Sequence, residues 1–204
     1  MATTTIYIVR HAHSDWTGDH NDNGRPLSDA GVEAAKVLAA RLASFPITAI
    51  YSSPYRRSVD TVVRLAERLN VRLELVPNLR ERELPVVPAG EFHRLVENAW
   101  RSPAESVEGG ESNIRAQARG LDVMRTVLER HQGQQVVLAT HGNLLALIVN
   151  GLDSVSGYEF WRRLSLPDIY RLEFDAMAFV GMTRMWEAAV SPAAVPDERQ
   201  SVEE

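Results

Sequence analysis

Two histidines and two arginines follow apolar segments that are predicted to be strands. Arg10 and His11 come directly after one such segment, Arg57 comes within about one turn of a second, and His141 follows another. The loops that follow parallel strands meet at one edge of a sheet, so these side chains are expected to converge. A guanidinium matches phosphate oxygens, and a neutral imidazole nitrogen can attack phosphorus. The pattern indicates a phosphate site with a histidine nucleophile.

His11 is the candidate nucleophile of this site. The neighbouring guanidiniums of Arg10 and Arg57 disfavour its imidazolium form, and they also stabilise the charge that builds up on the transferred phosphoryl group. The leaving alkoxide then needs a proton. Two carboxyl groups, Glu81 and Glu83, follow the third predicted strand and are both candidates for the acid.

The elements that must position these residues alternate along the chain. Apolar runs predict strands at 4–10, 47–52, 71–76 and 135–140, and two more at 169–174 and 182–187. Residues with a 3.6-residue apolar period lie between them. Strands that alternate with helices predict an α/β fold, a three-layer α/β/α sandwich with a mostly parallel central sheet, in which 71–76 is an edge strand.

The helix boundaries follow from capping residues. Ser28 is predicted to cap the first helix, and Ser53-Pro54 to form the cap and first turn of the second. A later helix at 114–130 is expected to bury a stripe that includes Ile114 and Ala118. Arg56 is expected to be a solvated helix residue or an ion-pair partner rather than a phosphate ligand.

Length and composition limit the class of protein. The 204 residues favour one domain, at 1–190, with 77–113 as a lid or insertion and 191–204 as a disordered acidic tail. The chain has no cysteine and a net charge of −5, which excludes thiolate chemistry and argues against a nucleic-acid partner. No signal peptide or 18-residue apolar run is evident, so we expect a cytoplasmic protein with no membrane partner.

Several motifs in the first 150 residues occur in a familiar order. They are RHAHSDW at 10–16, PLSDAGVEAA at 26–35, SSPYRRSVDT at 52–61, LRE at 79–81, GGES at 109–112 and THGN at 140–143. Together they resemble the histidine phosphatase superfamily, also called the phosphoglycerate-mutase-like family. By this resemblance His11 is the phosphorylated histidine, Arg10 and Arg57 bind phosphate, His141 is the second histidine, and Glu81 is the proton donor.

The resemblance also implies the substrate class. Ser14, Thr17 and Gly142 are the further residues expected to bind phosphate or substrate, where Thr17 replaces the asparagine of the mutases. The chain lacks the longer insertions of the mutases, which favours a phosphatase over a mutase. We expect this phosphatase to act on a small phosphomonoester, to need no cofactor, and to be a monomer or homodimer. The family usually has glycine at the position of Ala12, so we expect a cost of about 1 kcal/mol if that position needs a positive φ. The sequence after Glu81 also departs from the family pattern, so the resemblance does not define the residues of the leaving-group pocket.

Three other functions stay open at this level. One is a cofactor-dependent phosphoglycerate mutase, and another is a domain that binds a phosphorylated ligand without turnover. The third is a metal-dependent hydrolase, which activity in the presence of EDTA would exclude. Its candidate ligands are His11, His13, Asp15, His20 and His141.

Overall fold

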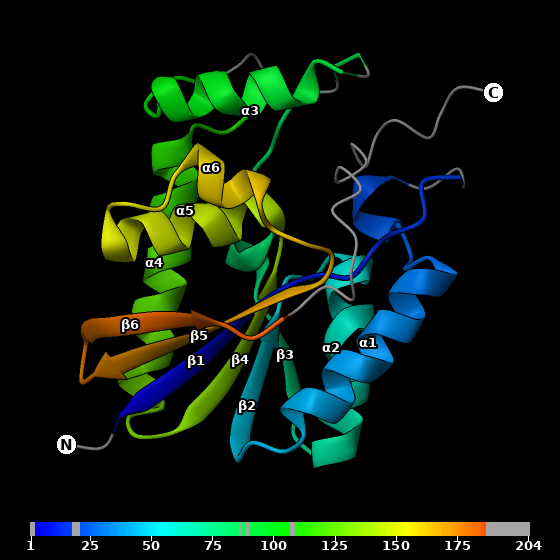
Figure 1. The fold of residues 1–204 in the computed structure, drawn as a ribbon, viewed down its shortest axis with the longest axis vertical. Helices are drawn as coiled ribbons and strands as arrows, with labels where there is room; N and C mark the ends of the chain where they lie inside the picture. The colour runs from blue at the N-terminus through cyan, green and yellow to red at the C-terminus, as the bar shows by residue number, and fades with distance from the viewer. Residues whose placement is uncertain (1–2, 18–20, 86, 89, 107–108, 187–204) are drawn as a thin grey trace.

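A six-stranded sheet lies at the centre of the molecule, with helices on both of its faces (Figure 1). The computed structural model describes residues 3–17, 21–85, 87–88, 90–106 and 109–186. The strand order is β3-β2-β4-β1-β5-β6. The predicted three-layer α/β/α architecture is confirmed. The predicted disordered tail at 191–204 lies outside the described residues.

The sheet is parallel on one side and antiparallel on the other. β4 pairs in parallel with both β1 and β2, and β3 pairs in parallel with β2, whereas β5 is antiparallel to β1 and to β6. β3 is an edge strand, as the sequence predicts. The strands are β1 (Thr4–Arg10), β2 (Ile47–Ser52), β3 (Leu73–Leu75), β4 (Gln135–Thr140), β5 (Asp168–Asp175) and β6 (Ala178–Arg184).

The helices are divided between the two faces of the sheet. α1 and α2 cover one face, while α4 and α5 cover the other, with α3 and α6 beyond them (Figure 1). The helices are α1 (Asp29–Leu42), α2 (Arg56–Leu69), α3 (Phe92–Arg101), α4 (Asn113–Arg130), α5 (Gly142–Asp153) and α6 (Tyr158–Arg162), with short 3₁₀ turns η1 (Asp22–Gly24) and η2 (Pro77–Leu79).

Side chains of β1 alternate between the two layers. Ile6 and Ile8 are buried in the core on the α4–α5 side, and Tyr7 and Val9 are buried in the core on the α1–α2 side. Successive side chains of a strand point to opposite faces, so a central strand that is apolar on both faces must be covered twice. No helix in the described part of the chain is long and apolar enough to span a membrane.

Two helices differ from the sequence-based expectation. α2 begins at Arg56 with Tyr55 as its N-cap, so Ser53 and Pro54 precede the helix rather than starting it. The hydroxyl of Ser53 is instead used elsewhere, as described below. In α4, Ile114 and Ala118 are exposed. The predicted stripe continues through Met124 and Leu128, and both of these are buried as expected. At the start of α4 the buried residues are instead Asn113, Ala116 and Gly120, and a Cβ atom at Gly120 would meet Ile148 and Leu144 of α5.

The first turn of α1 is packed directly against the loop that follows β1. Ser28 caps α1, since its hydroxyl accepts a hydrogen bond from Gly31 N, and its backbone N–H donates to the carbonyl of His13 (3.1 Å). A Cβ atom at Gly31 would lie 2.0 Å from that carbonyl oxygen. A glycine is therefore required at this position for α1 to approach the loop.

The carboxyl ends of three strands meet at one edge of the sheet. Arg10 of β1 is in register with Thr140 of β4, and the strands stay paired beyond their ends, because His11 N donates to Thr140 O (3.1 Å). Ser53 N likewise donates to Ala139 O (2.9 Å). The residues that follow β1, β2 and β4 are therefore neighbours, as the sequence predicts.

The close approach at Gly31 generates a stability prediction. Helix propensity alone would make Gly31→Ala stabilising by about 1 kcal/mol. We expect destabilisation by about 1–3 kcal/mol, because the new methyl group overlaps the His13 carbonyl and the backbone must shift. Urea unfolding measures the difference. Gly181→Ala, where nothing lies within 4 Å of the added Cβ, is the control, and equal stability of the two variants would contradict the prediction.

Candidate active site

The imidazole of His11 is buried and held by hydrogen bonds on both of its nitrogens. Its side chain is 2% exposed. Arg57 Nε lies 3.1 Å from His11 Nε2, and His11 Nδ1 lies 2.7 Å from the carbonyl oxygen of Ala12. A guanidinium can only donate and a carbonyl can only accept. The neutral tautomer with the proton on Nδ1 satisfies both contacts, and it leaves the lone pair of Nε2 directed towards Arg57.

Arg57 and Arg10 are two buried cations of this site. Arg57, in the first turn of α2, is 2% exposed. Arg10 is 8% exposed and donates from NH1 to the carbonyl of Leu164 (3.0 Å). Its guanidinium lies against Gly142, where a Cβ atom would be only 3.0 Å from Nε. Gly142, the first residue of α5, thus leaves room for the Arg10 side chain.

The loop that holds Arg10 is fixed by an ion pair between buried Asp168 and partly exposed Arg184. Asp168 is fully buried, accepts hydrogen bonds from Ser165 N (3.0 Å) and Ile169 N (3.0 Å), and pairs with Arg184 (2.7 Å). Burial raises the pKa of Asp168, although Arg184 and the backbone donors oppose this shift. This pair therefore fixes the segment between α6 and β5, which carries the carbonyl that Arg10 contacts.

His141 is fully buried beside His11, and the centres of the two rings are 5.1 Å apart. Burial lowers the pKa of His141 well below its ordinary value, and the charges of Arg57, His11, Arg25 and Arg10 lower it further. Its Nε2 contacts the hydroxyl of Ser53 (2.8 Å), while Nδ1 has no hydrogen-bond partner among the described residues.

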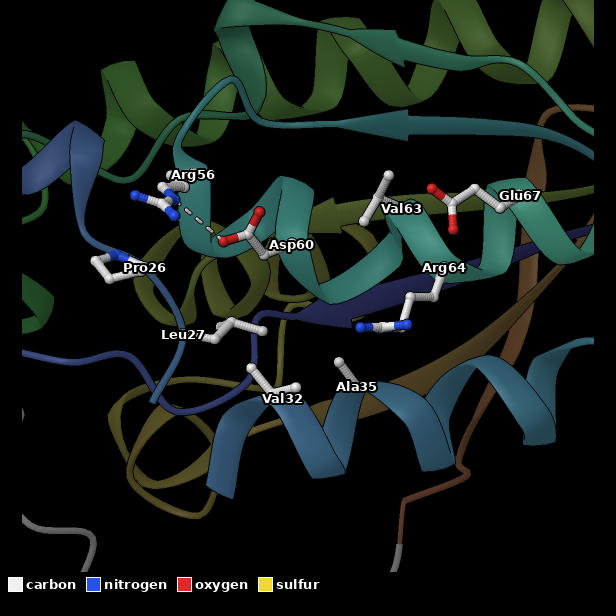
Figure 2. Close-up of a pocket in the computed structure, with 9 residues that line it drawn as sticks. All are labelled: Pro26, Leu27, Val32, Ala35, Arg56, Asp60, Val63, Arg64 and Glu67. Atoms are coloured by element: carbon white, nitrogen blue, oxygen red, sulfur yellow. Dashed lines mark ion pairs between the residues drawn. The ribbon is translucent and has the colours of Figure 1, made fainter. Parts of the chain in front are cut away.

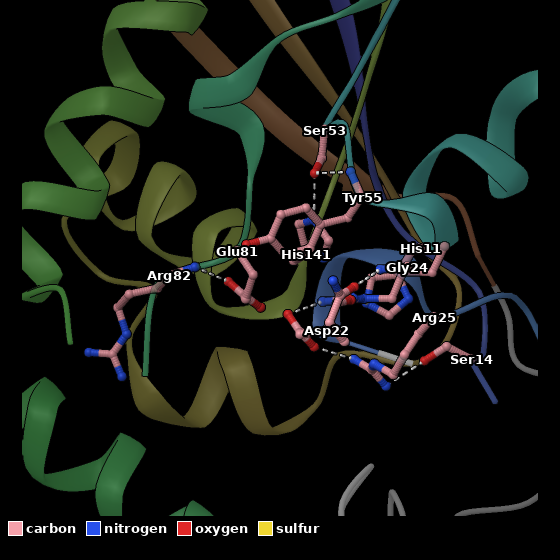
Figure 3. Close-up of polar contacts among 12 residues, drawn as sticks. His11, Ser14, Asp22, Gly24, Arg25, Ser53, Tyr55, Glu81, Arg82 and His141 are labelled. Atoms are coloured by element: carbon pink, nitrogen blue, oxygen red, sulfur yellow. Dashed lines mark hydrogen bonds and ion pairs between the residues drawn. The ribbon is translucent and has the colours of Figure 1, made fainter. Parts of the chain in front are cut away.

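Ser53 and Tyr55 orient this ring. Ser53 Oγ accepts a hydrogen bond from Tyr55 N (3.2 Å), so its own proton is available to donate to Nε2 of His141. His141 Nδ1 then carries a proton that can be donated to a ligand. The ring of Tyr55 packs edge-on against His141 and lies near the guanidinium of Arg57 (Figure 3). The sequence analysis did not predict a role for Ser53 or Tyr55 in the site, because it assigned Ser53 to the cap of the second helix.

Asp22 and Arg25 are two further charged residues at this site that sequence reasoning missed (Figure 3). Arg25 is 3% exposed; it donates to Ser14 Oγ (2.9 Å) and to Asp22 Oδ1 (2.9 Å). Asp22 accepts from Arg57 through its carbonyl (2.5 Å) and its carboxylate (3.3 Å). The only sequence signal was an Arg-Pro step in a loop rich in Asp, Asn and Gly. The site therefore has three buried guanidiniums rather than two.

Glu81 is attached to the start of α5. Its Oε1 accepts from Arg82 N (2.8 Å) and Leu144 N (3.1 Å), and its Oε2 accepts from Asn143 N (3.1 Å). These donors fix the carboxyl group at the first turn of α5, the helix whose N-cap is His141 (Figure 3). The alternative acid, Glu83, has a half-exposed side chain that pairs with Arg80 (3.3 Å).

The structure does not bring every predicted residue into this group. Thr17 is exposed and its hydroxyl donates to Asp15 Oδ1 (2.7 Å), so its contact with phosphate stays a prediction. His13 contacts the hydroxyl of Ser28 (2.9 Å) and closes the loop. Arg56 pairs with Asp60 on the surface of α2 (3.4 Å), as predicted.

Ala12 does not carry the strain that its replacement of glycine suggested. It is absent from the positive-φ residues, which are Asn70, Ser154 and Ala176 outside glycine. Its side chain is buried in a small cluster with Leu27 and Ala35, and its N–H donates to Thr61 (2.9 Å). The expected cost of about 1 kcal/mol for a positive φ therefore does not apply.

Comparison with known sequences assigns the family. The sequence model of the histidine phosphatase superfamily (branch 1) matches residues 6–183, a span that contains every residue of the site. The chain belongs to this superfamily. The resemblance inferred from the motifs is thereby confirmed.

Three similar proteins each share less than 30% sequence identity with this chain. A probable phosphoglycerate mutase GpmB of Escherichia fergusonii is 28% identical over 83% of this chain and 85% of its own length. A metal-independent phosphoserine phosphatase of Arabidopsis thaliana is 28% identical over 71% of this chain and 67% of its own. The solved structure of Bacillus stearothermophilus YhfR has the same fold, with a TM-score of 0.73, 24% identity and coverage of 87% and 94%.

A separate cavity of about 300 Å³ lies between α1 and α2 (Figure 2). Its walls are apolar at Leu27, Val32 and Val63, and the Arg56–Asp60 ion pair lies at one side. None of the residues grouped around His11 lines it. In the described part of the chain, no three His, Asp or Glu side chains are placed to hold a metal ion.

The lowered pKa of His141 predicts how stability depends on pH. A histidine ionises at about pH 6.5 in the unfolded chain, whereas folded His141 resists protonation. Its contribution is present above that pH and is lost as the pH falls below it, by up to about 1.4 kcal/mol per pH unit. Urea unfolding at pH 7.5 and 5.5 should show a steeper loss for the unmodified protein than for His141→Gln. His131→Gln, at the opposite end of the sheet, is the control, and parallel losses in all three proteins would contradict the assignment.

Proposed function

We propose that the protein is a phosphatase that hydrolyses phosphomonoesters through a covalent phosphohistidine on His11. The observation that carries this proposal is the hydrogen bond from Arg57 Nε to His11 Nε2, which fixes a neutral imidazole beside a buried guanidinium. A neutral nitrogen nucleophile and a cation for the phosphoryl oxygens are the two things that phosphoryl transfer requires. Both are present within one contact.

The first step forms the phosphoenzyme. The lone pair of His11 Nε2 attacks phosphorus, the bond from phosphorus to the ester oxygen breaks, and the electron pair of that bond leaves with the alcohol. Arg10 and Arg57 stabilise the charge on the remaining phosphoryl oxygens. His141, neutral and with Nδ1 unpaired among the described residues, donates a hydrogen bond to one of them. Ser14 and the N-terminus of α5 at Gly142 are the further expected contacts.

Glu81 supplies the proton that the departing alcohol oxygen needs. Among the residues that the structure describes, its Oε2 accepts one backbone hydrogen bond, from Asn143 N, which leaves room on this oxygen for the proton. In the second step water attacks phosphorus, the phosphorus–nitrogen bond breaks, and Glu81 takes the proton of the water. Inorganic phosphate leaves, and His11 returns to its neutral form.

Phosphatase activity is favoured over the other functions by several observations. Relatives include proteins named as phosphoserine phosphatases, one of them metal-independent, as well as probable mutases. A domain that only binds phosphate would not need a carboxyl group held beside the second histidine, as Glu81 is. We therefore propose a small phosphomonoester as substrate, with no cofactor.

Substitution of the nucleophile tests the covalent step. His11→Ala should abolish hydrolysis of p-nitrophenyl phosphate, because no phosphoenzyme can form. Arg57→Ala and His141→Ala should each lower kcat/KM by at least about 10²-fold through lost stabilisation of transition-state charge. Asp122→Asn, on the exposed face of α4, is the control, and EDTA should leave the activity unchanged. Full activity of His11→Ala would refute the mechanism.

The proton-donor role of Glu81 predicts a dependence on the leaving group. Glu81→Gln should hydrolyse p-nitrophenyl phosphate at close to the normal rate, since that phenolate leaves without a proton. It should lose most of its activity on an alkyl phosphate, whose alkoxide is a poor leaving group. Steady-state kinetics on both esters, with Glu83→Gln as the matched control, measures this. Equal losses on the two esters would assign the acid to another residue.

A further inference from the structure

The carboxylate of Asp22 is bound to two of the guanidiniums that surround His11. Asp22 Oδ1 accepts from Arg25 NH2 (2.9 Å), and Oδ2 accepts from Arg57 NH2 (3.3 Å). Its carbonyl oxygen also accepts from Arg57 NH1 (2.5 Å). An anionic group of the protein thus contacts Arg57, which the proposed mechanism assigns to the phosphoryl oxygens, and Arg25, whose guanidinium binds the same carboxylate.

This arrangement occupies all three nitrogens of Arg57. Nε donates to the lone pair of His11 Nε2, and the two terminal nitrogens donate to Asp22. Phosphorus can be attacked only by a free lone pair, and the phosphoryl oxygens need donors from Arg57. A bound phosphate must therefore take the place of His11 at Nε, which has a single N–H. At the two terminal nitrogens it competes with the carbonyl and carboxylate oxygens of Asp22 for donors.

The three side chains differ in their freedom to move. The side chains of Arg57 and Arg25 are each 3% exposed, whereas that of Asp22 is 53% exposed. The guanidiniums are therefore enclosed, while the carboxylate lies at the mouth of the site and faces solvent. Exchange of acceptors is achieved with the least disturbance if Asp22 moves outward and the arginines stay.

We propose that Asp22 is an internal competitor of phosphate: its carboxylate binds Arg57 and Arg25 in the empty site and is displaced when a phosphate group enters. This inference rests on the proposed function. It makes Asp22 a residue that sets the affinity and selectivity of the site. A ligand must bring more negative charge than a single carboxylate to displace Asp22, which favours a phosphomonoester dianion over a carboxylate ligand.

The competitor also reduces apparent affinity. If the site is open in only a fraction of the molecules, the apparent Kd of the ligand is the intrinsic Kd divided by that fraction. Partial desolvation raises the pKa of Asp22, but the guanidiniums of Arg57 and Arg25 outweigh this and hold it below its ordinary value, so the competing charge is present at neutral pH. Removal of this charge should increase the affinity for phosphate.

The opposite role is the alternative that the experiment must separate. Asp22 contacts both arginines, so it could instead hold them in the orientation that phosphate needs. In that case its removal would weaken phosphate binding. The sign of the change in phosphate affinity therefore distinguishes a competitor from a positioning residue.

Calorimetric titration with inorganic phosphate at pH 7.5 tests the inference on the full chain. Asp22→Asn keeps the size and the backbone carbonyl contact but removes the charge, and we expect it to bind phosphate about three- to tenfold more tightly. Asp60→Asn removes the same charge one turn along α2 from Arg57, where its partner is the exposed Arg56. We expect this control to bind within about twofold of the unmodified protein.

Turnover provides a second measurement. In Asp22→Asn, the KM for p-nitrophenyl phosphate should fall by a similar factor while kcat changes less, because the substitution changes ground-state binding. Asp22→Ser, which also removes the carboxylate, replaces Asp22→Asn if that variant does not fold.

Each outcome decides between the proposals. Unchanged or weaker phosphate binding by Asp22→Asn would overturn the competitor role. If no form of the protein binds phosphate, this inference and the proposed function both fail. If the unmodified protein binds phosphate without hydrolysing its esters, only the proposed function fails, and the order of the affinities still decides the role of Asp22.

Discussion

The hydrogen bond from Arg57 to His11 is the constraint on which the site depends. A guanidinium is always a donor, so the imidazole nitrogen that faces it must be an acceptor. The carbonyl of Ala12 makes the matching demand on the other nitrogen. Two fixed groups of the protein thus select one tautomer of His11, and no carboxylate is needed to orient this ring. The same contact keeps the reactive nitrogen covered until an anion takes the place of the imidazole.

Burial of so many cations would be unfavourable without the sheet that collects them. Strand β4 lies between β1 and β2, so residues that are about 40 and 130 positions apart become neighbours at the ends of adjacent strands. Backbone pairing continues past the strand ends at His11 and Ser53. The charge of each guanidinium is then partly compensated by its own acceptor: Asp22 for Arg57, Leu164 O for Arg10 and Ser14 Oγ for Arg25. Burial lowers the pKa of His141, and the charges of these arginines lower it further.

The sequence was informative where function follows from local order. Arg10, His11 and His141 end or follow strands with clear apolar patterns, and the chain motifs carried the resemblance to the superfamily that the comparisons confirmed. The bounds of β1, β2 and β4 agree with the prediction for the same reason.

The features that escaped prediction are long-range pairings of irregular segments. Asp22 and Arg25 lie in a loop with no periodicity, so nothing local indicates that they contact Arg57 and Ser14. Ser53 has the residue type of a helix cap, but its hydroxyl is bound by His141 from another strand. Ile114 fits a helical stripe, yet at the start of α4 the packing on α5 buries other residues. The local hydrogen bond of the Thr17 hydroxyl with Asp15 likewise had no signal in the sequence.

The contact between Arg10 and the Leu164 carbonyl has a consequence for how this molecule is made. That carbonyl belongs to a segment fixed by Asp168, which in turn is paired with Arg184 at the end of β6. Arg10, from the beginning of the chain, therefore depends for its position in the proposed phosphate site on residues near the end of the chain. A nascent polypeptide that has left the ribosome only as far as α5 already contains every residue proposed to react, but it lacks the support for the Arg10 side chain. Assembly of the C-terminal hairpin onto β1 thus completes the support of the proposed phosphate site, and a fragment without this hairpin should lack that support although it contains every residue proposed to react.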